Sequence, residues 1–296
     1  MATMRDSFPL KSMACATAAA CLLPFGPQVP AAARADASLR YVALGDSYTS
    51  APHISRARPG SPVSCRRSER NYPGRIARRL RVRSFTDMSC SGAALRHLTA
   101  RQGTNPPQFS ALRANTTLVT LTMGGNDIGF NKWKTCAILS LIDSKGAPCR
   151  KKLRRGGADP FARAFARTGP RFGAALRRIH ERSPLAEVYV LGYPRLVPPT
   201  GGGCYPRVPL ARGDVGMLRN VHRRLNAMLA RQARANGAVF VDMSEPGHDM
   251  CQRDERKRWI EPFFPTRRAA PLHPNAGGAA AMARAVLRAV RRPVDV

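Results

Sequence analysis

A serine stands directly after a short apolar run near the start of the chain, where residues 39–44 (LRYVAL) precede Gly45-Asp46-Ser47. The run predicts a short buried strand, and Ser47 then opens a helical turn. In that position a serine exposes its hydroxyl beside backbone N–H groups, which suits a nucleophile whose reaction develops an oxyanion. It is not the G-x-S-x-G elbow of α/β-hydrolases, because Thr49 takes the second glycine position. The alternative is a serine that only caps a helix.

Two further loops carry groups that can donate hydrogen bonds to a ligand. Gly124-Gly125-Asn126-Asp127 follows the apolar run at residues 117–123 (TLVTLTM), and Gly92 follows Cys90-Ser91. The glycines allow close backbone approach, and the Asn126 side-chain amide can donate to an oxyanion. The alternative for both segments is a plain turn.

A histidine precedes the last predicted helix in Leu272-His273-Pro274-Asn275. His273 is either a general base or a loop histidine that faces solvent. The other five histidines have no spacing typical of metal ligands, so we expect no metal and no other cofactor. They are His53, His97, His180, His222 and His248.

Alternating periodicities predict the elements that would position these residues. We expect strands at 39–44, near 81–88, and at 117–123, 187–191 and 238–241, with helices at 72–80, 160–181, 214–235 and 275–290. Strands that alternate with helices predict βαβ units and a mainly parallel sheet. Functional loops of such sheets lie at the carboxyl ends of the strands, where Ser47 and Asn126 are expected. We expect one domain over residues 36–296, with an insertion at 135–160.

The first 35 residues are typical of a secretory signal peptide. Arg5 and Lys11 form a basic segment, residues 13–23 are apolar, and Ala33-Arg34-Ala35 provides a cleavage site before Asp36. The apolar segment is too short to span a bilayer as a regular helix. The alternative is an anchor that stays uncut. The sequence therefore predicts a secreted, extracellular protein.

The cysteines indicate disulfides. Six cysteines lie beyond residue 35, and an even number in an exported chain predicts disulfides with about 15 possible pairings, of which sequential pairing is the simplest. No C-x-x-C occurs in the chain, which disfavours a zinc ribbon or a thioredoxin-like redox site. The six are Cys65, Cys90, Cys136, Cys149, Cys204 and Cys251.

The charge of the chain is unusual. Of its 296 residues, 49 are Lys or Arg and 18 are Asp or Glu, which gives a net charge of +31. Such a charge suggests a nucleic-acid partner, but the basic residues are spread along the chain and no motif of stacking aromatic residues accompanies them. We therefore expect no nucleic-acid partner, and we interpret the charge as favouring contact with anionic surfaces. The rival function is a cationic exported protein that binds cell-wall polymer or nucleic acid without turnover.

Taken together, Ser47, Gly92, Asn126 and His273, within GDSY, SG, GGND and HPN, resemble the SGNH (GDSL-type) hydrolase superfamily. The four motifs occur in the family's order over nearly the whole chain beyond residue 35. The six cysteines and the stretch Gly247-His248-Asp249-x-Cys251 are similar to the secreted actinobacterial lipase and esterase branch. The resemblance implies an α/β fold, a three-layer α/β/α sandwich with a mainly parallel sheet of about five strands.

The resemblance also implies a function, that of a secreted carboxylic ester hydrolase acting on an acyl ester or lipid. Ser47 would attack the carbonyl and His273 would take its proton, with an acyl-enzyme intermediate. Backbone N–H groups of Ser47 and Gly92 and the Asn126 amide would form the oxyanion hole. We expect a monomer. The aromatic residues that precede His273 are either core or an apolar rim for acyl chains; they are Trp259, Phe263 and Phe264.

One position departs from the family pattern. Most members have an Asp three residues before the histidine, and here that residue is Ala270. Part of the actinobacterial branch resembles this chain and uses a Ser–His dyad with a backbone carbonyl in place of the acid. We therefore predict that the Ala270 carbonyl orients His273. A more distant acid, Glu261 or Asp249, is the alternative.

Overall fold

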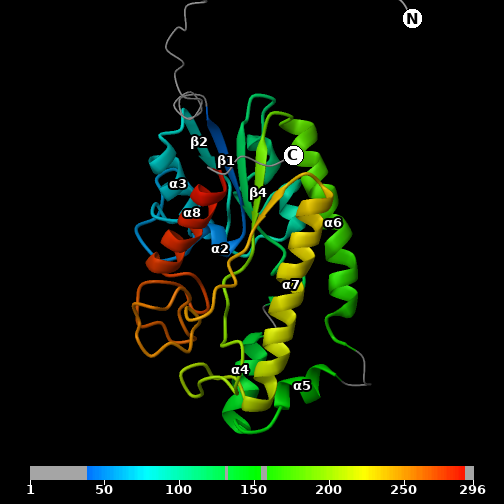
Figure 1. Cartoon of the computed structure of the whole chain (residues 1–296), viewed down its shortest axis with the longest axis vertical. Helices are drawn as coiled ribbons and strands as arrows, with labels where there is room; N and C mark the ends of the chain where they lie inside the picture. The colour runs from blue at the N-terminus through cyan, green and yellow to red at the C-terminus, as the bar shows by residue number, and fades with distance from the viewer. Residues whose placement is uncertain (1–38, 131–132, 155–158, 291–296) are drawn as a thin grey trace, which may run out of the picture.

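A computed structural model describes residues 39–130, 133–154 and 159–290 (Figure 1). The predicted signal peptide at residues 1–35 lies outside the described residues. Five parallel strands form one sheet in the order β2-β1-β3-β4-β5. The strands are β1 (Arg40–Gly45), β2 (Ser84–Asp87), β3 (Leu118–Thr122), β4 (Glu187–Leu191) and β5 (Val239–Val241).

Helices cover both faces of the sheet. Figure 1 shows α3 (Tyr72–Leu80) and α8 (Ala276–Val290) on one side, and α6 (Ala162–Arg182) and α7 (Val215–Ala235) on the other. The remaining α-helices are α2 (Ser47–Ser50), α4 (Trp133–Ile142) and α5 (Pro148–Leu153), and 3₁₀ turns lie at Val63–Cys65, Leu95–Leu98, Gln108–Ala111 and Arg212–Asp214. The predicted three-layer α/β/α sandwich is confirmed.

The central strands are apolar because both of their faces are covered. All five residues of β3 are buried, and so are the last five of β1. A strand buried on both faces has no polar side to alternate with, so it appears in the sequence as a nearly continuous apolar run. Large side chains such as Tyr41, Leu44 and Leu121 fill the core.

The strand order places a topological switch point beside β1. From β1 the chain first adds β2 on one side and then crosses to add β3 on the other. Ligand sites of open parallel sheets lie outside the carboxyl ends of the strands at such a point. The loops that begin with Asp46 and Gly124 leave the sheet on either side of this point.

The predicted elements agree closely with the observed ones. Helix α3 has the predicted bounds, and its predicted cap is present because the Asn71 Oδ1 accepts a hydrogen bond from the Gly74 N–H at 3.0 Å. The insertion at 135–160 proved to contain α5 and most of α4, neither of which was predicted. Helix α4 is apolar on nearly all sides (WKTCAILSLI), so it lacks the periodicity by which an amphipathic helix is recognised.

Three disulfides form among the described residues, and they follow the sequential pairing: Cys65–Cys90, Cys136–Cys149 and Cys204–Cys251. The second joins α4 to α5. Among the described residues, no helix combines the length and apolar character needed to cross a membrane.

Candidate active site

Ser47 lies at the first position of α2, immediately after the N-cap. The cap is Asp46, whose Oδ1 accepts a hydrogen bond from the Tyr48 N–H at 2.8 Å. The capping function is thus met by the carboxylate, and the alternative of Ser47 as a cap is ruled out. The Ser47 Oγ instead lies 2.8 Å from the Nε2 of His273, a residue 226 positions away in the chain.

The other ring nitrogen of His273 determines which tautomer the ring adopts. Its Nδ1 lies 2.6 Å from the carbonyl oxygen of Pro271. Since a carbonyl can only accept, Nδ1 must carry the proton. In the neutral ring Nε2 then holds a lone pair, so the Ser47 hydroxyl donates to it. This is the arrangement in which histidine can take a proton from serine.

The structure corrects the prediction that Ala270 orients the ring. The Ala270 carbonyl accepts from the backbone N–H of His273 at 3.2 Å and is therefore used by the turn itself. Leu272 adopts a left-handed conformation with φ of 65°. The chain reverses there, so the carbonyl two residues before the histidine, that of Pro271, lies against the imidazole.

Hydrogen bonds from α2 and within its own backbone hold the loop that carries His273. The Tyr48 hydroxyl donates to the Leu272 carbonyl at 2.7 Å, which links the residue after Ser47 to the residue before His273. The Glu261 N–H donates to the His273 carbonyl at 3.0 Å. The Glu261 carboxylate accepts from the Asn275 amide at 2.6 Å, so it braces the start of α8.

The loops that contain Gly92 and Asn126 are joined to each other beside the end of β1. The Cys90 N–H donates to the Gly45 carbonyl at 3.0 Å, and Gly92 has a φ of 79°. The Asn126 Nδ2 donates to the Ala93 carbonyl at 2.8 Å. An amide nitrogen has two hydrogens, so one remains for a ligand.

A buried carboxylate connects the loops that follow β1, β3 and β4. The Asp46 Oδ2 accepts from the Tyr193 hydroxyl at 2.6 Å, and that hydroxyl accepts from the Gly125 N–H at 2.9 Å. Burial raises the pKa of Asp46 to about 7, although the hydrogen bonds from Tyr193 and Tyr48 act in the opposite direction. Sequence reasoning missed Tyr48 and Tyr193. Their signal was position, because each lies two or three residues after a strand.

Replacing Asp46 with asparagine is expected to change the pH dependence of stability. The folded protein holds the Asp46 proton up to pH about 7, whereas the unfolded chain releases it near pH 3.8. The neutral carboxyl thus contributes stability that is complete below about pH 4 and is lost as pH rises through about 7. Relative to Asp46→Asn, the free energy of unfolding of the wild type should fall by on the order of 4 kcal/mol across this range. Urea unfolding of both proteins at several pH values measures this, and a difference independent of pH would contradict it.

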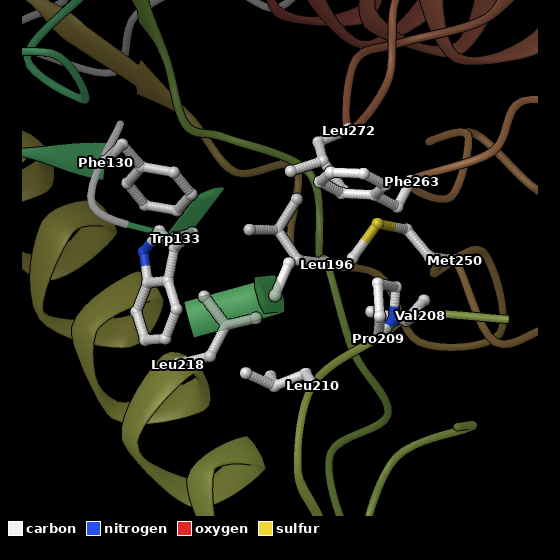
Figure 2. A pocket seen from close by; sticks show the side chains of 11 residues that line it. Phe130, Trp133, Leu196, Val208, Pro209, Leu210, Leu218, Met250, Phe263 and Leu272 are labelled. Carbon is white, nitrogen blue, oxygen red and sulfur yellow. The ribbon is translucent and has the colours of Figure 1, made fainter. Parts of the chain in front are cut away.

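An apolar pocket opens next to the loop that carries His273 (Figure 2). Leu272, the neighbour of His273, contributes one wall together with Phe263. The other lining residues come from α4, α7 and the loops after β3, β4 and β5; they are Phe130, Trp133, Ala137, Leu196, Val208, Pro209, Leu210, Leu218 and Met250. The lining of this pocket is apolar, so the pocket favours an apolar ligand group.

The aromatic residues before His273 divide between the two predicted environments. Phe263 lines the pocket, whereas Phe264 is 69% exposed. Trp259 is buried and stacks on His248, with the ring centroids 3.9 Å apart. Trp259 thus belongs to the core, whereas a rim for acyl chains stays a prediction.

Comparisons with known proteins agree with this architecture. A family model described as the GDSL-like Lipase/Acylhydrolase family matches residues 43–281. Lipase 2 of Streptomyces coelicolor is 38% identical over 260 residues, which cover 86% of each chain. Crystal structures of phospholipase A1 from Streptomyces albidoflavus NA297 and of an extracellular lipase from Streptomyces rimosus match with TM-scores of 0.69 and 0.67. Each is 28% identical, and the match covers 85% of this chain and 99% of the other.

Proposed function

Because the chain belongs to the GDSL-like lipase/acylhydrolase family, we propose that it is a secreted ester hydrolase with Ser47 as nucleophile and His273 as general base. The observation that carries this proposal is the 2.8 Å contact between the Ser47 Oγ and the His273 Nε2 at the carboxyl ends of the strands. Residues 36–296 would form one catalytic domain, in keeping with a family match over 43–281. The extracellular lipase among the relatives supports secretion.

The first half of the reaction forms an acyl-enzyme. The Ser47 Oγ attacks the ester carbonyl carbon while the His273 Nε2 accepts the hydroxyl proton. The Pro271 carbonyl accepts the hydrogen bond from Nδ1–H and thereby stabilises the imidazolium that forms. When the tetrahedral intermediate collapses, the bond to the alcohol breaks and the Nε2 proton passes to the departing oxygen.

The negative charge on the tetrahedral oxygen needs donors that are already in place. We assign this function to the N–H groups of Ser47 and Gly92 and to the free hydrogen of the Asn126 amide. The hydrogen bond from Asn126 to the Ala93 carbonyl would keep the last two donors at a constant separation. In the second half, water attacks the acyl-enzyme, His273 takes its proton, and Ser47 leaves with that proton.

We assign the pocket beside Leu272 to the acyl chain of the substrate. Its walls are apolar, and it begins one residue from the general base, so it would receive the acyl chain of a fatty ester. The similar proteins described as Lipase 2 and as phospholipase A1 support this assignment. We therefore propose an acyl ester or lipid substrate.

An acyl-length series tests this function. With monomeric p-nitrophenyl esters, kcat/KM is expected to rise about fourfold for each added methylene until the pocket is filled, since each buried methylene contributes about 0.8 kcal/mol. Beyond that length the value should level off. A flat series would contradict acyl binding in this pocket, and no hydrolysis at any length would instead favour the rival function, a cationic binding protein without turnover.

A further inference from the structure

Helix α4 exposes an apolar surface that the described part of the chain leaves uncovered. Ile138, Leu141 and Ile142 are 63%, 66% and 83% exposed, and together we call them the α4 outer face. The opposite side of the helix is buried through Trp133, Cys136, Ala137 and Ser140. A surface helix ordinarily presents polar residues to water, so an apolar outer face indicates a contact partner.

The same helix that carries the α4 outer face also lines the pocket with its other side. Trp133 and Ala137, on the buried side, line the pocket that ends at Leu272. On the opposite wall the pocket residue Phe263 contacts Phe264, which is itself 69% exposed. The segments that form these two walls thus also carry exposed apolar residues, as expected for a site that receives its ligand from an apolar phase.

The helix next to α4 carries positive charge. In α5 and just after it, Arg150, Lys151, Lys152 and Arg154 are all exposed, and the helix contains no acidic residue. The Cys136–Cys149 disulfide joins the two helices, so the apolar and basic surfaces belong to one stapled unit. Figure 1 places α4 and α5 at the end of the molecule toward which the strands' carboxyl ends point, whereas α2 lies nearer the middle, where β1 ends.

We propose that the α4 outer face inserts into the surface of an anionic lipid layer while the basic residues of α5 contact its headgroups. A short element with apolar residues on one surface and Lys and Arg beside them is the pattern of proteins that lie in the membrane interface. The charge complementarity favours anionic lipid over a second copy of this chain, because two basic α5 helices would repel each other. This inference rests on the proposed function for its purpose, the delivery of lipid acyl chains to the pocket.

Sedimentation with lipid vesicles tests the proposal. The parent protein is the exported chain with Ser47→Ala, so that the vesicles are not consumed. We expect it to bind vesicles of equimolar phosphatidylcholine and phosphatidylglycerol. The triple variant Ile138→Gln/Leu141→Gln/Ile142→Gln should bind about 100-fold more weakly, because three partly buried apolar side chains are lost. Lys151→Gln/Lys152→Gln should weaken binding about 25-fold, an effect that salt reduces.

A matched control is Leu185→Gln. Leu185 is 66% exposed but precedes β4, at the opposite end of the sheet, and its replacement should leave binding unchanged. Thermal unfolding verifies that each variant is folded. Unchanged vesicle binding by the triple variant would overturn the proposal, and so would a dimer in sedimentation velocity that the triple variant abolishes. Vesicle binding without ester hydrolysis by the wild type would refute the proposed function and leave this surface assignment intact.

Discussion

Replacing Ser47 with alanine is expected to lower kcat/KM for p-nitrophenyl esters by at least about 10⁴-fold. The methyl group leaves no atom to attack the carbonyl, and the His273 Nε2 loses the hydroxyl that lies 2.8 Å away. The fold should persist, because Asp46 rather than Ser47 caps α2. Steady-state rates, with urea unfolding as the check on structure, measure both parts of this result.

The same helical turn offers a matched control in Ser50→Ala. Ser50 is buried, and in the part of the chain that the structure describes its hydroxyl has no hydrogen-bond partner. Removing it deletes the same atom from the same helix without touching His273, so activity should stay within about twofold. If Ser47→Ala retained wild-type hydrolysis, the assignment of the nucleophile would be wrong.

His273→Ala extends this expected result to the pair. Serine and histidine act as one unit, so the double variant with Ser47→Ala should be scarcely slower than either single variant. If the loss of activity in the double variant equalled the product of the two single losses, the residues would act separately. It would contradict the hydrogen bond between the Ser47 Oγ and the His273 Nε2 as the basis of activation.

Replacing Asn126 with alanine is the second large expected effect, a loss of about 10²–10³-fold in kcat with KM nearly unchanged. The amide is assigned to the oxyanion, which exists only after attack, so substrate binding should be little affected. Asn126 also donates to the Ala93 carbonyl at 2.8 Å, so unfolding must be measured alongside the rates. A rise in KM with kcat unchanged would contradict an oxyanion function.

Asn126→Asp separates the electrostatic effect from loss of volume. The carboxylate has nearly the same size, yet when ionised it cannot donate and it repels the oxyanion, so its loss should equal or exceed that of alanine. The adjacent change Asp127→Asn serves as control. Asp127 accepts from the Leu95 N–H at 3.1 Å, which an asparagine oxygen can also do, so the effect should stay within about tenfold.

Much of the fold follows from local sequence. Helix α3 and strand β4 have the predicted bounds, because caps and apolar runs act within a few residues. Helix α4 was missed because it faces the pocket on one side and exposes Ile138, Leu141 and Ile142 on the other, so its sequence has no polar stripe. A periodicity argument assumes that the exposed side of a surface helix is polar, and the assumption fails for α4.

The candidate site, too, was predictable in its residue types but not in its backbone geometry. The types and order of Ser47, Gly92, Asn126 and His273 pointed to their chemistry, since a nucleophile, amide donors and a base differ in functional groups that the sequence displays directly. Which carbonyl orients His273 depended on a backbone reversal at Leu272, where a φ of 65° turns the Pro271 oxygen toward the ring. A residue count cannot reveal a dihedral angle.

The sequence by itself thus indicated the family, the five strands and the longer helices in their order, and the candidate reacting groups, because these depend on residue type and near neighbours. Only the tertiary structure decided how segments 226 residues apart meet and that Pro271 replaces the expected Ala270. It also decided that Tyr48 and Tyr193 link the loops that carry these residues. The reason is physical: long-range contacts and backbone reversals arise from the packing of the whole chain, which no local pattern encodes.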